Sequence, residues 1–207
     1  MKTVHIEFIG DFICPWCYLG KVRLERIQKI LAPDIQLDIE VKPYILYPKI
    51  QKGGAPKSVF ARKTKPGMGK ALRHEAKLEN LQFNYKLIDR IPRSMEAHRL
   101  IWLIENNDLK YQLSKTIFHD YFEKGQDIEN IEYLTTIAKL AGISENTISE
   151  FTKTDRGTKA IETQIQTYKE DCITVVPYMK INRMIAIPGL QSTEVLENYL
   201  KRAARMV

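Results

Sequence analysis

Apolar and polar residues follow two different periods along the chain, and the period changes where the predicted elements change. The stretch 2–9 is apolar enough for a β-strand, and residues 18–31 carry apolar side chains at helical spacing. Residues 35–42 alternate between apolar and polar, which predicts a second strand that ends at Pro43. A strand, a helix and a strand in this order predict two parallel strands joined by a crossover helix.

The middle of the chain shows helical periodicity only. Helices are predicted at 69–81, 94–105, 109–123, 130–140, 144–151 and 158–169. Strand character returns at 178–182 and 184–187, which a turn of hairpin length separates. An amphipathic helix is predicted at 192–206.

This order of elements predicts an α/β fold in which a large all-helical insertion interrupts one mixed sheet. The sheet-forming domain is expected to be discontinuous, with residues 1–45 and 172–207 in it. Residues 46–171 would form a basic loop and the helical insertion.

Two cysteines in the sequence Cys-Pro-Trp-Cys follow the first predicted strand and precede the first predicted helix. This spacing at such a junction is typical of a redox-active dithiol. Cys14 would lie at the helix N-terminus, where unpaired N–H groups and the helix dipole favour the thiolate, which is the attacking species. Cys17 would lie one turn further on, close enough to attack a mixed disulfide formed on Cys14. Pro15 suits the first helical turn because no N–H is needed there.

Two other interpretations of the cysteine pair compete with this one. Half of a zinc site would need further ligands, but Cys172 is the one other cysteine and the four histidines are scattered without ligand spacing. A pair of buried structural cysteines is the second alternative. Spacing and context together favour redox chemistry, and we expect no bound metal.

Composition bounds the class of protein. Of the 207 residues, 44% are hydrophobic and 28% charged, which indicates a globular protein with one large domain or a small domain carrying an insertion. No apolar run approaches membrane-spanning length, and the first residues lack the pattern of a secretion signal. Three cysteines do not make a disulfide framework. We therefore expect a cytoplasmic protein without a membrane partner, in which a disulfide is transient and catalytic.

The net charge of +7 is partly concentrated in the stretch 48–70, which contains no acidic residue. Its cations are Lys49, Lys52, Lys57, Arg62, Lys63, Lys65 and Lys70. Such a run could meet nucleic acid or an acidic substrate. Its glycines and prolines are typical of a solvated loop, and it matches no recognised nucleic-acid-binding motif. We predict a loop and no nucleic-acid partner.

Three stretches occur in an order that is shared with a known family. They are Asp-Phe-Ile-Cys-Pro-Trp-Cys-Tyr-Leu-Gly-Lys at 11–21, Ala-His-Arg-Leu at 97–100, and Val-Pro-Tyr at 176–178 with Pro-Gly-Leu-Gln at 188–191. With the order of elements, they resemble the thioredoxin fold, and the helical insertion makes the chain similar to DsbA-type proteins. Within these it resembles the FrnE-like branch of DsbA-family thioredoxin-domain oxidoreductases. The resemblance implies a thioredoxin-like mixed sheet with a DsbA-like helical insertion.

The resemblance implies a substrate site around the dithiol. In thioredoxin-fold proteins a cis-proline precedes the hairpin strand and faces the cysteines, which is the place of Pro177 here. The backbone of Val176 would pair with an extended substrate segment. An ordinary trans proline at the start of an edge strand is the alternative. Pro15 and Trp16 would complete the substrate-binding rim. The family commonly has glycine where Val175 stands, and the extra side chain could narrow the groove.

The resemblance also implies a buried carboxylate near Cys17 that transfers a proton while the mixed disulfide is resolved. Glu7 on the first predicted strand is our candidate, and Asp11 is the second. The alternative for Glu7 is an exposed charge at the sheet edge.

Other polar residues near these motifs have structural interpretations. Cys172 stands where the family usually has a small residue, often glycine, and we interpret it as a buried small apolar residue. A third thiol near the active site is the alternative. His98 is expected to pack or to make a structural hydrogen bond, and Lys21 is a nearby cation or a solvated residue on the helix surface.

These residues favour the function of a thiol–disulfide oxidoreductase. The resemblance implies an enzyme of the DsbA family, a protein disulfide oxidoreductase. Cys14 would attack and Cys17 would resolve, with protein, peptide or small-molecule thiols and disulfides as partners. No cofactor is expected beyond the redox disulfide, and glutathione is a candidate co-substrate. The insertion could be a substrate lid or a homodimer surface.

Two other functions are kept as alternatives. One is a glutathione-dependent isomerase or transferase of the kappa-class type. Those enzymes typically have serine at the first active-site position and lack the dithiol, so Cys14 and Cys17 argue against that class. The other is a chaperone-like peptide-binding module, which an apolar groove around Trp16 and Pro177 would suit.

Overall fold

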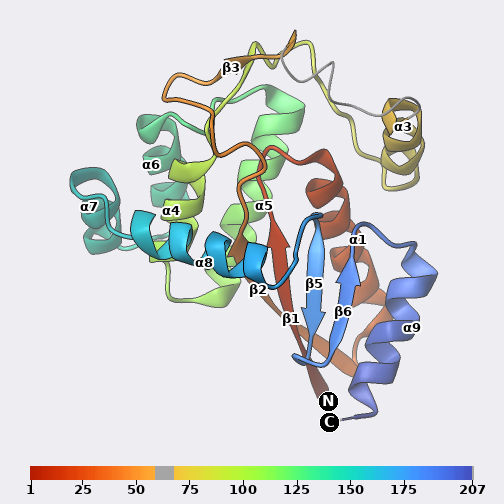
Figure 1. The fold of residues 1–207 in the computed structure, drawn as a ribbon. Coiled ribbons are helices and arrows are strands. Elements are labelled where there is room, and N and C mark those ends of the chain that lie inside the picture. Colours follow the sequence, from red (N-terminus) through yellow and green to blue (C-terminus); the bar gives the residue numbers. More distant parts are fainter. Residues whose placement is uncertain (59–67, 207) are drawn as a thin grey trace.

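A four-stranded mixed sheet forms the centre of the computed structural model, which describes residues 1–58 and 68–206 (Figure 1). The sheet has the order β2-β1-β5-β6 and consists of β1 (Lys2–Gly10), β2 (Ile35–Pro43), β5 (Tyr178–Ile181) and β6 (Ile185–Pro188). β1 and β2 run parallel, and α1 (Pro15–Leu31) connects them. β5 is antiparallel to β1 and pairs with β6 as a hairpin. The predicted β-α-β and β-β-α halves are therefore confirmed.

One face of the sheet is closed by two helices. Ile6 and Phe8 lie two residues apart on β1, so both point to the same face of the sheet. They belong to one apolar cluster with Leu24 and Ile27 of α1 and with buried residues of α9 (Thr193–Ala204). Figure 1 shows α1 and α9 side by side along this face, with the N- and C-termini close together. The dithiol segment is thus anchored to the sheet through α1.

The segment between β2 and β5 forms the predicted helical insertion. Its helices are α3 (Met68–Leu78), α4 (Met95–Leu103), α5 (Asn107–Lys124), α6 (Ile131–Leu140), α7 (Glu145–Lys153) and α8 (Thr158–Glu170). Asn106, Asn130 and Ser144 accept hydrogen bonds from backbone N–H groups in the first turns of α5, α6 and α7. A short ribbon of β3 (Ala55–Pro56) and β4 (Arg90–Ile91) lies outside our prediction, because two residues are too few to show a period. Buried residues of the sheet and the insertion form one contiguous cluster.

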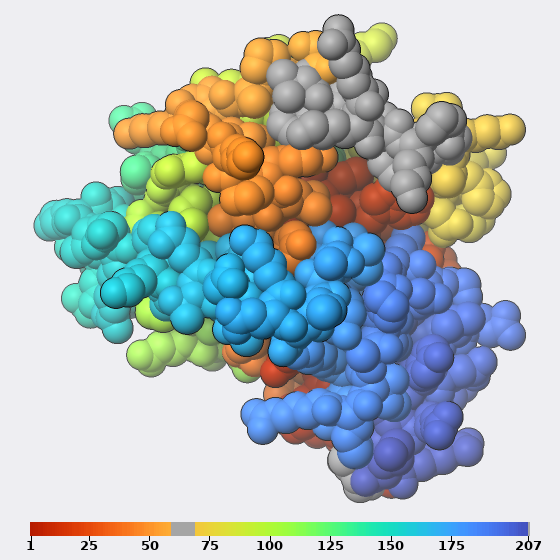
Figure 2. Space-filling view, in the orientation of Figure 1, coloured from red at the N-terminus to blue at the C-terminus, as the bar shows by residue number. Residues whose placement is uncertain are grey.

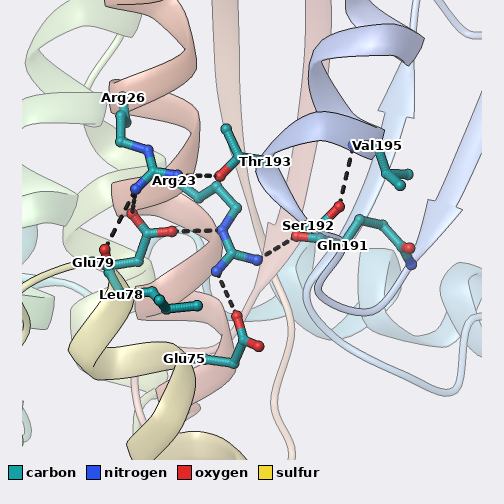
Figure 3. A network of polar contacts seen from close by, with 9 residues as sticks. All are labelled: Arg23, Arg26, Glu75, Leu78, Glu79, Gln191, Ser192, Thr193 and Val195. Atoms are coloured by element: carbon teal, nitrogen blue, oxygen red, sulfur yellow. Dashed lines mark hydrogen bonds and ion pairs between the residues drawn. The ribbon is translucent and has the colours of Figure 1, made fainter.

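Helix α3 lies apart from the other insertion helices and packs beside α1 (Figure 1). Arg23 of α1 donates to the carboxylates of Glu75 and Glu79, at 2.7 Å each, and to the carbonyl of Gln191 (Figure 3). Arg26 lies 3.3 Å from the second oxygen of Glu79. The side chains of Arg23 and Glu79 are only 3% and 1% exposed. This buried network ties α3 and the loop before α9 to the helix that holds the dithiol.

Two features of the structure concern the membrane and nucleic-acid partners that our sequence analysis considered. Within the part of the chain that the structure describes, no helix is both long enough and apolar enough to cross a membrane. Of the basic run, Lys49, Lys52, Lys57 and Lys70 are exposed. The other three cations, Arg62, Lys63 and Lys65, lie outside the described residues.

Candidate active site

Cys14 precedes the first helical residue of α1. Its φ and ψ of −93° and 111° are extended, and Pro15 follows at the start of the helix. The chain arrives from β1 through a tight turn, in which the N–H of Cys14 donates to the carbonyl of Asp11 at 3.0 Å. The carbonyl of Cys14 then accepts from the N–H of Cys17. The predicted position of Cys14 at the N-terminus of a helix is confirmed.

Cys17 lies one turn inside α1 and is fully buried. Gly10, the last residue of β1, makes room for it, because a Cβ at Gly10 would lie only 3.1 Å from the Cys17 Sγ. Burial raises the pKa of the Cys17 thiol, and the neighbouring Cys14 side chain raises it further. Cys17 therefore remains protonated at neutral pH, and an attack by its sulfur requires a proton acceptor.

Asp11 contacts Cys17 through its backbone, and the charge of its carboxylate reaches the Cys17 thiol. Asp11 affects the pKa of Cys17 less than burial and Cys14 do. A backbone hydrogen bond from Asp11 lowers this pKa, and the charge of Asp11 raises it. Asp11 is itself fully buried, and its Oδ2 accepts from the N–H of Leu46 at 2.7 Å. Its Oδ1 lies 3.5 Å from Nε2 of His98, a residue of α4 that is 3% exposed. The insertion therefore contributes a buried imidazole to the surroundings of the dithiol.

Glu7 does not lie with the dithiol. Successive residues of a strand point to opposite faces, and Phe8 packs near Gly20 on the α1 face. Glu7 is half-buried and points to the other face. There the pKa of Tyr168 on α8 is raised by burial and then by the charge of Glu7. The candidate proton acceptor of the site is therefore Asp11 rather than Glu7.

Pro177, directly before β5, lies against α1, the helix that follows Cys14. The Val176–Pro177 bond is cis, as the resemblance implies. Pro177 is buried, and a Cβ at Gly20 of α1 would lie 3.3 Å from its Cγ. The carbonyl oxygen of Val176 lies 3.9 Å from the Cys14 Sγ. A segment far along the sequence is thus brought against the first cysteine.

A cavity of about 1060 Å³ opens beside Cys14. Four of the predicted site residues line it, namely Cys14, Pro15, Trp16 and Val176. Atoms of the N-terminal segment, in red, are visible between the orange segment after β2 and the yellow α3 in Figure 2. The wall that our sequence analysis did not identify consists of Leu72, Ala76, Phe83, Tyr85, Tyr121 and Phe122, among others. The sequence marks only the four aromatic members of this wall, which occur close together at 83 and 85 and at 121 and 122.

The third cysteine does not join the pair. Cys172 is exposed, which corrects our interpretation of it as a buried residue. Its φ of 58° lies in the left-handed region that favours glycine, so its position is set by a turn rather than by packing. Cys172 is not among the described residues that line the cavity. Within residues 1–58 and 68–206, no three His, Cys, Asp or Glu side chains gather as metal ligands.

Comparisons with known proteins agree with this geometry. The model of the DSBA-like thioredoxin domain matches residues 5–201. A curated relative, the uncharacterized protein YwbO of Bacillus subtilis (strain 168), is 23% identical over 201 residues, which cover 94% of each chain. The structure of a probable DsbA oxidoreductase from Streptomyces coelicolor superposes with a TM-score of 0.80 at 20% identity, over 97% of this chain and 89% of that one. The cytosolic disulfide reductase DsbM from Pseudomonas aeruginosa, determined with GSH, gives 0.69 at 15% identity, over 97% and 99%.

At these identities the likeness to the two solved structures shows the fold, which is the predicted thioredoxin-like sheet with its helical insertion. The match to the family model shows the family as well as the fold, because it covers residues 5–201, which include both cysteines and Pro177. The chain therefore belongs to the DSBA-like thioredoxin domain family.

Proposed function

We propose that the protein is a thiol–disulfide oxidoreductase in which Cys14 attacks and Cys17 resolves. The observation that supports this most directly is the position of Cys14, which directly precedes α1, borders a cavity and has Cys17 in the first turn of the helix that follows it. Membership of a family with thiol–disulfide oxidoreductases supports the same chemistry. The FrnE-like branch stays a prediction from the sequence.

The reaction can be written as two exchanges of sulfur. The Cys14 thiolate attacks one sulfur of a substrate disulfide, an S–S bond forms to Cys14, and the first substrate thiolate leaves with a proton from solvent. Cys17 then loses its proton and attacks the Cys14 sulfur, which releases the second substrate thiol and leaves the Cys14–Cys17 disulfide. Two electrons pass from the enzyme dithiol to the substrate disulfide. A thiol reductant such as glutathione returns the enzyme to the dithiol, and the reverse sequence oxidises a substrate dithiol.

The substrate would be positioned by the segment around Pro177 and by the start of α1. The carbonyl of Val176 faces the Cys14 sulfur at 3.9 Å, so the backbone there can pair with an extended part of a substrate. Pro15 and Trp16 are half-buried and line the cavity on the other side of Cys14. Substrate sulfur would meet Cys14 between these two walls.

Glutathione is proposed as the co-substrate, and a reducing compartment, the cytoplasm, as the location. One structural neighbour with the same fold is described as a cytosolic disulfide reductase with GSH. A dithiol that cycles through a transient disulfide is suited to a compartment where thiol buffers keep cysteines reduced. A homodimer through the insertion stays a prediction from the sequence.

The experiment that tests the proposed function traps the mixed disulfide. A Cys17→Ser variant lacks the resolving thiol, so its Cys14 should remain bonded to one half of a disulfide such as oxidised glutathione. Cys172 is exposed and would react by itself, so all proteins carry Cys172→Ser. We expect one adduct per chain on Cys14 by mass spectrometry, and none with Cys17 restored. Absence of an adduct on Cys14 would contradict the proposal.

Asp11→Asn is expected to slow the attack of Cys17 by about 10²-fold at neutral pH, the size typical of general base catalysis. The pKa of Cys17 is raised by burial, so at neutral pH its thiol must give up a proton, and the asparagine cannot accept it. As the pH rises, Cys17 ionises without help, so the deficit should shrink. Release of the second substrate thiol, followed by rapid mixing across neutral and alkaline pH, measures this step.

Glu7→Gln is the matched control, since it also removes one carboxylate from the start of the chain. Glu7 points away from α1, so the rate should stay within about twofold of the parent at every pH. A slow Glu7→Gln variant beside a normal Asp11→Asn variant would return the role to Glu7.

A further inference from the structure

The cavity beside Cys14 defines the chemical class of substrate more closely than the dithiol does. Cys14 is only 3% exposed, yet it lines a cavity of about 1060 Å³. This volume is at the upper end of the range of small-molecule sites. A sulfur that reacts with Cys14 therefore has to enter the cavity or reach in from its rim.

The inner wall of this cavity is apolar and aromatic. Phe122 of α5 is 2% exposed, and Phe83 packs edge-on against it with ring centres 5.2 Å apart and planes at 88°. Trp16 and Leu72, the latter on α3, also line this cavity, as Cys14 does. Rings that hold one another in this way present a preformed apolar surface, which suits an aromatic or similarly bulky apolar body.

The rim of the cavity is positively charged. Lys57, Arg73 and Lys77 line it, and no Asp or Glu is found among its described lining residues. The carboxylates of helix α3 and its end point away from the cavity, because Glu75 of α3 and Glu79, the residue after α3, are held against α1 by Arg23 (Figure 3). Two cations of α3, Arg73 and Lys77, line the cavity. Charge complementarity therefore favours an occupant with an anionic group.

Two phenols lie where they can assist the reacting sulfur. Tyr47 and Tyr85 line the cavity. Burial raises the pKa of both hydroxyls, and the charge of Cys14 raises it further. Both remain neutral hydrogen-bond donors within electrostatic reach of Cys14, able to stabilise a departing thiolate.

We propose that the substrate of the dithiol is a small apolar disulfide, or the corresponding thiol, that carries a ring-sized body and an anionic group. The body would lie against Phe83 and Phe122, the anionic group would meet Arg73 and Lys77, and the sulfur would reach Cys14. This inference rests on the proposed function and specifies its substrate. In the reductive direction the enzyme dithiol becomes a disulfide, the substrate disulfide becomes two thiols, and glutathione returns two electrons.

Three probe disulfides of known chemistry test the proposal. They are 5,5′-dithiobis(2-nitrobenzoate), which is aromatic and anionic, 4,4′-dithiodipyridine, which is aromatic and neutral, and bis(2-hydroxyethyl) disulfide, which is aliphatic and neutral. Each kcat/KM with glutathione as reductant is divided by the rate constant of free glutathione thiolate with the same probe. The normalised values should fall in that order, and the protein disulfides of insulin should be reduced most slowly.

Charge reversal at the rim tests the anionic part. Arg73→Glu/Lys77→Glu should lower the normalised value for the anionic probe by roughly 10-fold, the sum expected for two lost attractions and two new repulsions. The value for the aliphatic probe should stay unchanged. Lys70→Glu/Lys153→Glu is the matched control, because it changes the net charge equally at exposed positions outside the cavity lining.

The outcomes separate this inference from the proposed function. Equal normalised values for aromatic and aliphatic probes, or fastest reduction of insulin, would overturn the substrate class while the oxidoreductase activity stands. An equal effect of both charge-reversal pairs would overturn the role of the rim. Absence of Cys14-dependent turnover with every probe would overturn the proposed function and this inference with it.

Discussion

Replacement of Cys14 by serine is expected to reduce disulfide exchange to the uncatalysed background. A serine oxygen neither ionises near neutral pH nor forms a disulfide, so the first exchange is abolished rather than slowed. Cys14 is also the member of the pair that lines the cavity, and Cys17 is fully buried behind it. The remaining thiol therefore cannot take its place. Turnover of a chromogenic disulfide with glutathione as reductant measures the loss.

The control for Cys14→Ser is Cys172→Ser, the same exchange at the exposed cysteine. This variant should keep the parental kcat/KM, because Cys172 lies outside the cavity lining. Substantial turnover by Cys14→Ser that disappears when Cys172 is also replaced would move the reactive thiol to Cys172.

Replacement of Arg23 by alanine should lower the free energy of unfolding by about 3–5 kcal/mol, the range for breaking a buried ion pair. The guanidinium is almost fully buried and satisfies Glu75, Glu79 and a backbone carbonyl at once (Figure 3). Its loss leaves the buried Glu79 with Arg26 alone, at 3.3 Å. Because the network attaches α3, the wall of the cavity should also loosen. Equilibrium denaturation with urea measures the change in stability.

Arg156→Ala is the matched control for this loss. Arg156 pairs with Glu150 on the surface, where the two side chains are 59% and 32% exposed. A surface pair of this kind contributes about 0–1 kcal/mol, because water and salt screen it. Equal destabilisation by the two arginine variants would show that the burial of Arg23 has no energetic consequence.

The fold could be predicted where the period of apolar residues was long and clear. The alternation of 35–42 and the helical spacing of 18–31 correspond to β2 and α1. Helix α1 begins three residues earlier, at Pro15, because the dithiol itself forms the first turn and has no apolar period of its own. The β3–β4 ribbon is held by pairing between residues far apart in sequence, which no local pattern records.

The positions of Cys14, Cys17 and Pro177 could be predicted from the sequence, whereas those of the charged groups near them could not be predicted as well. Alternation along β1 already places Glu7 and Phe8 on opposite faces, so the pattern contained a signal against Glu7. Lys21 had no such signal. It is 1% exposed, its Nζ lies 3.0 Å from the ring centre of Tyr111, and burial lowers its pKa well below the usual range. The ring that covers it comes from α5, ninety residues away, so its burial is a property of the tertiary fold.

The most direct test of the central claim is the reduction potential of the Cys14–Cys17 couple. The Cys172→Ser protein is equilibrated in mixtures of reduced and oxidised glutathione, free thiols are blocked with an alkylating agent, and the oxidised fraction is measured by mass spectrometry. We predict a single reversible transition in which both cysteines are lost together, with a midpoint that distinguishes a reductant from an oxidant. A protein that forms no intramolecular disulfide at any ratio, or that only accumulates glutathione on Cys14, would contradict the account.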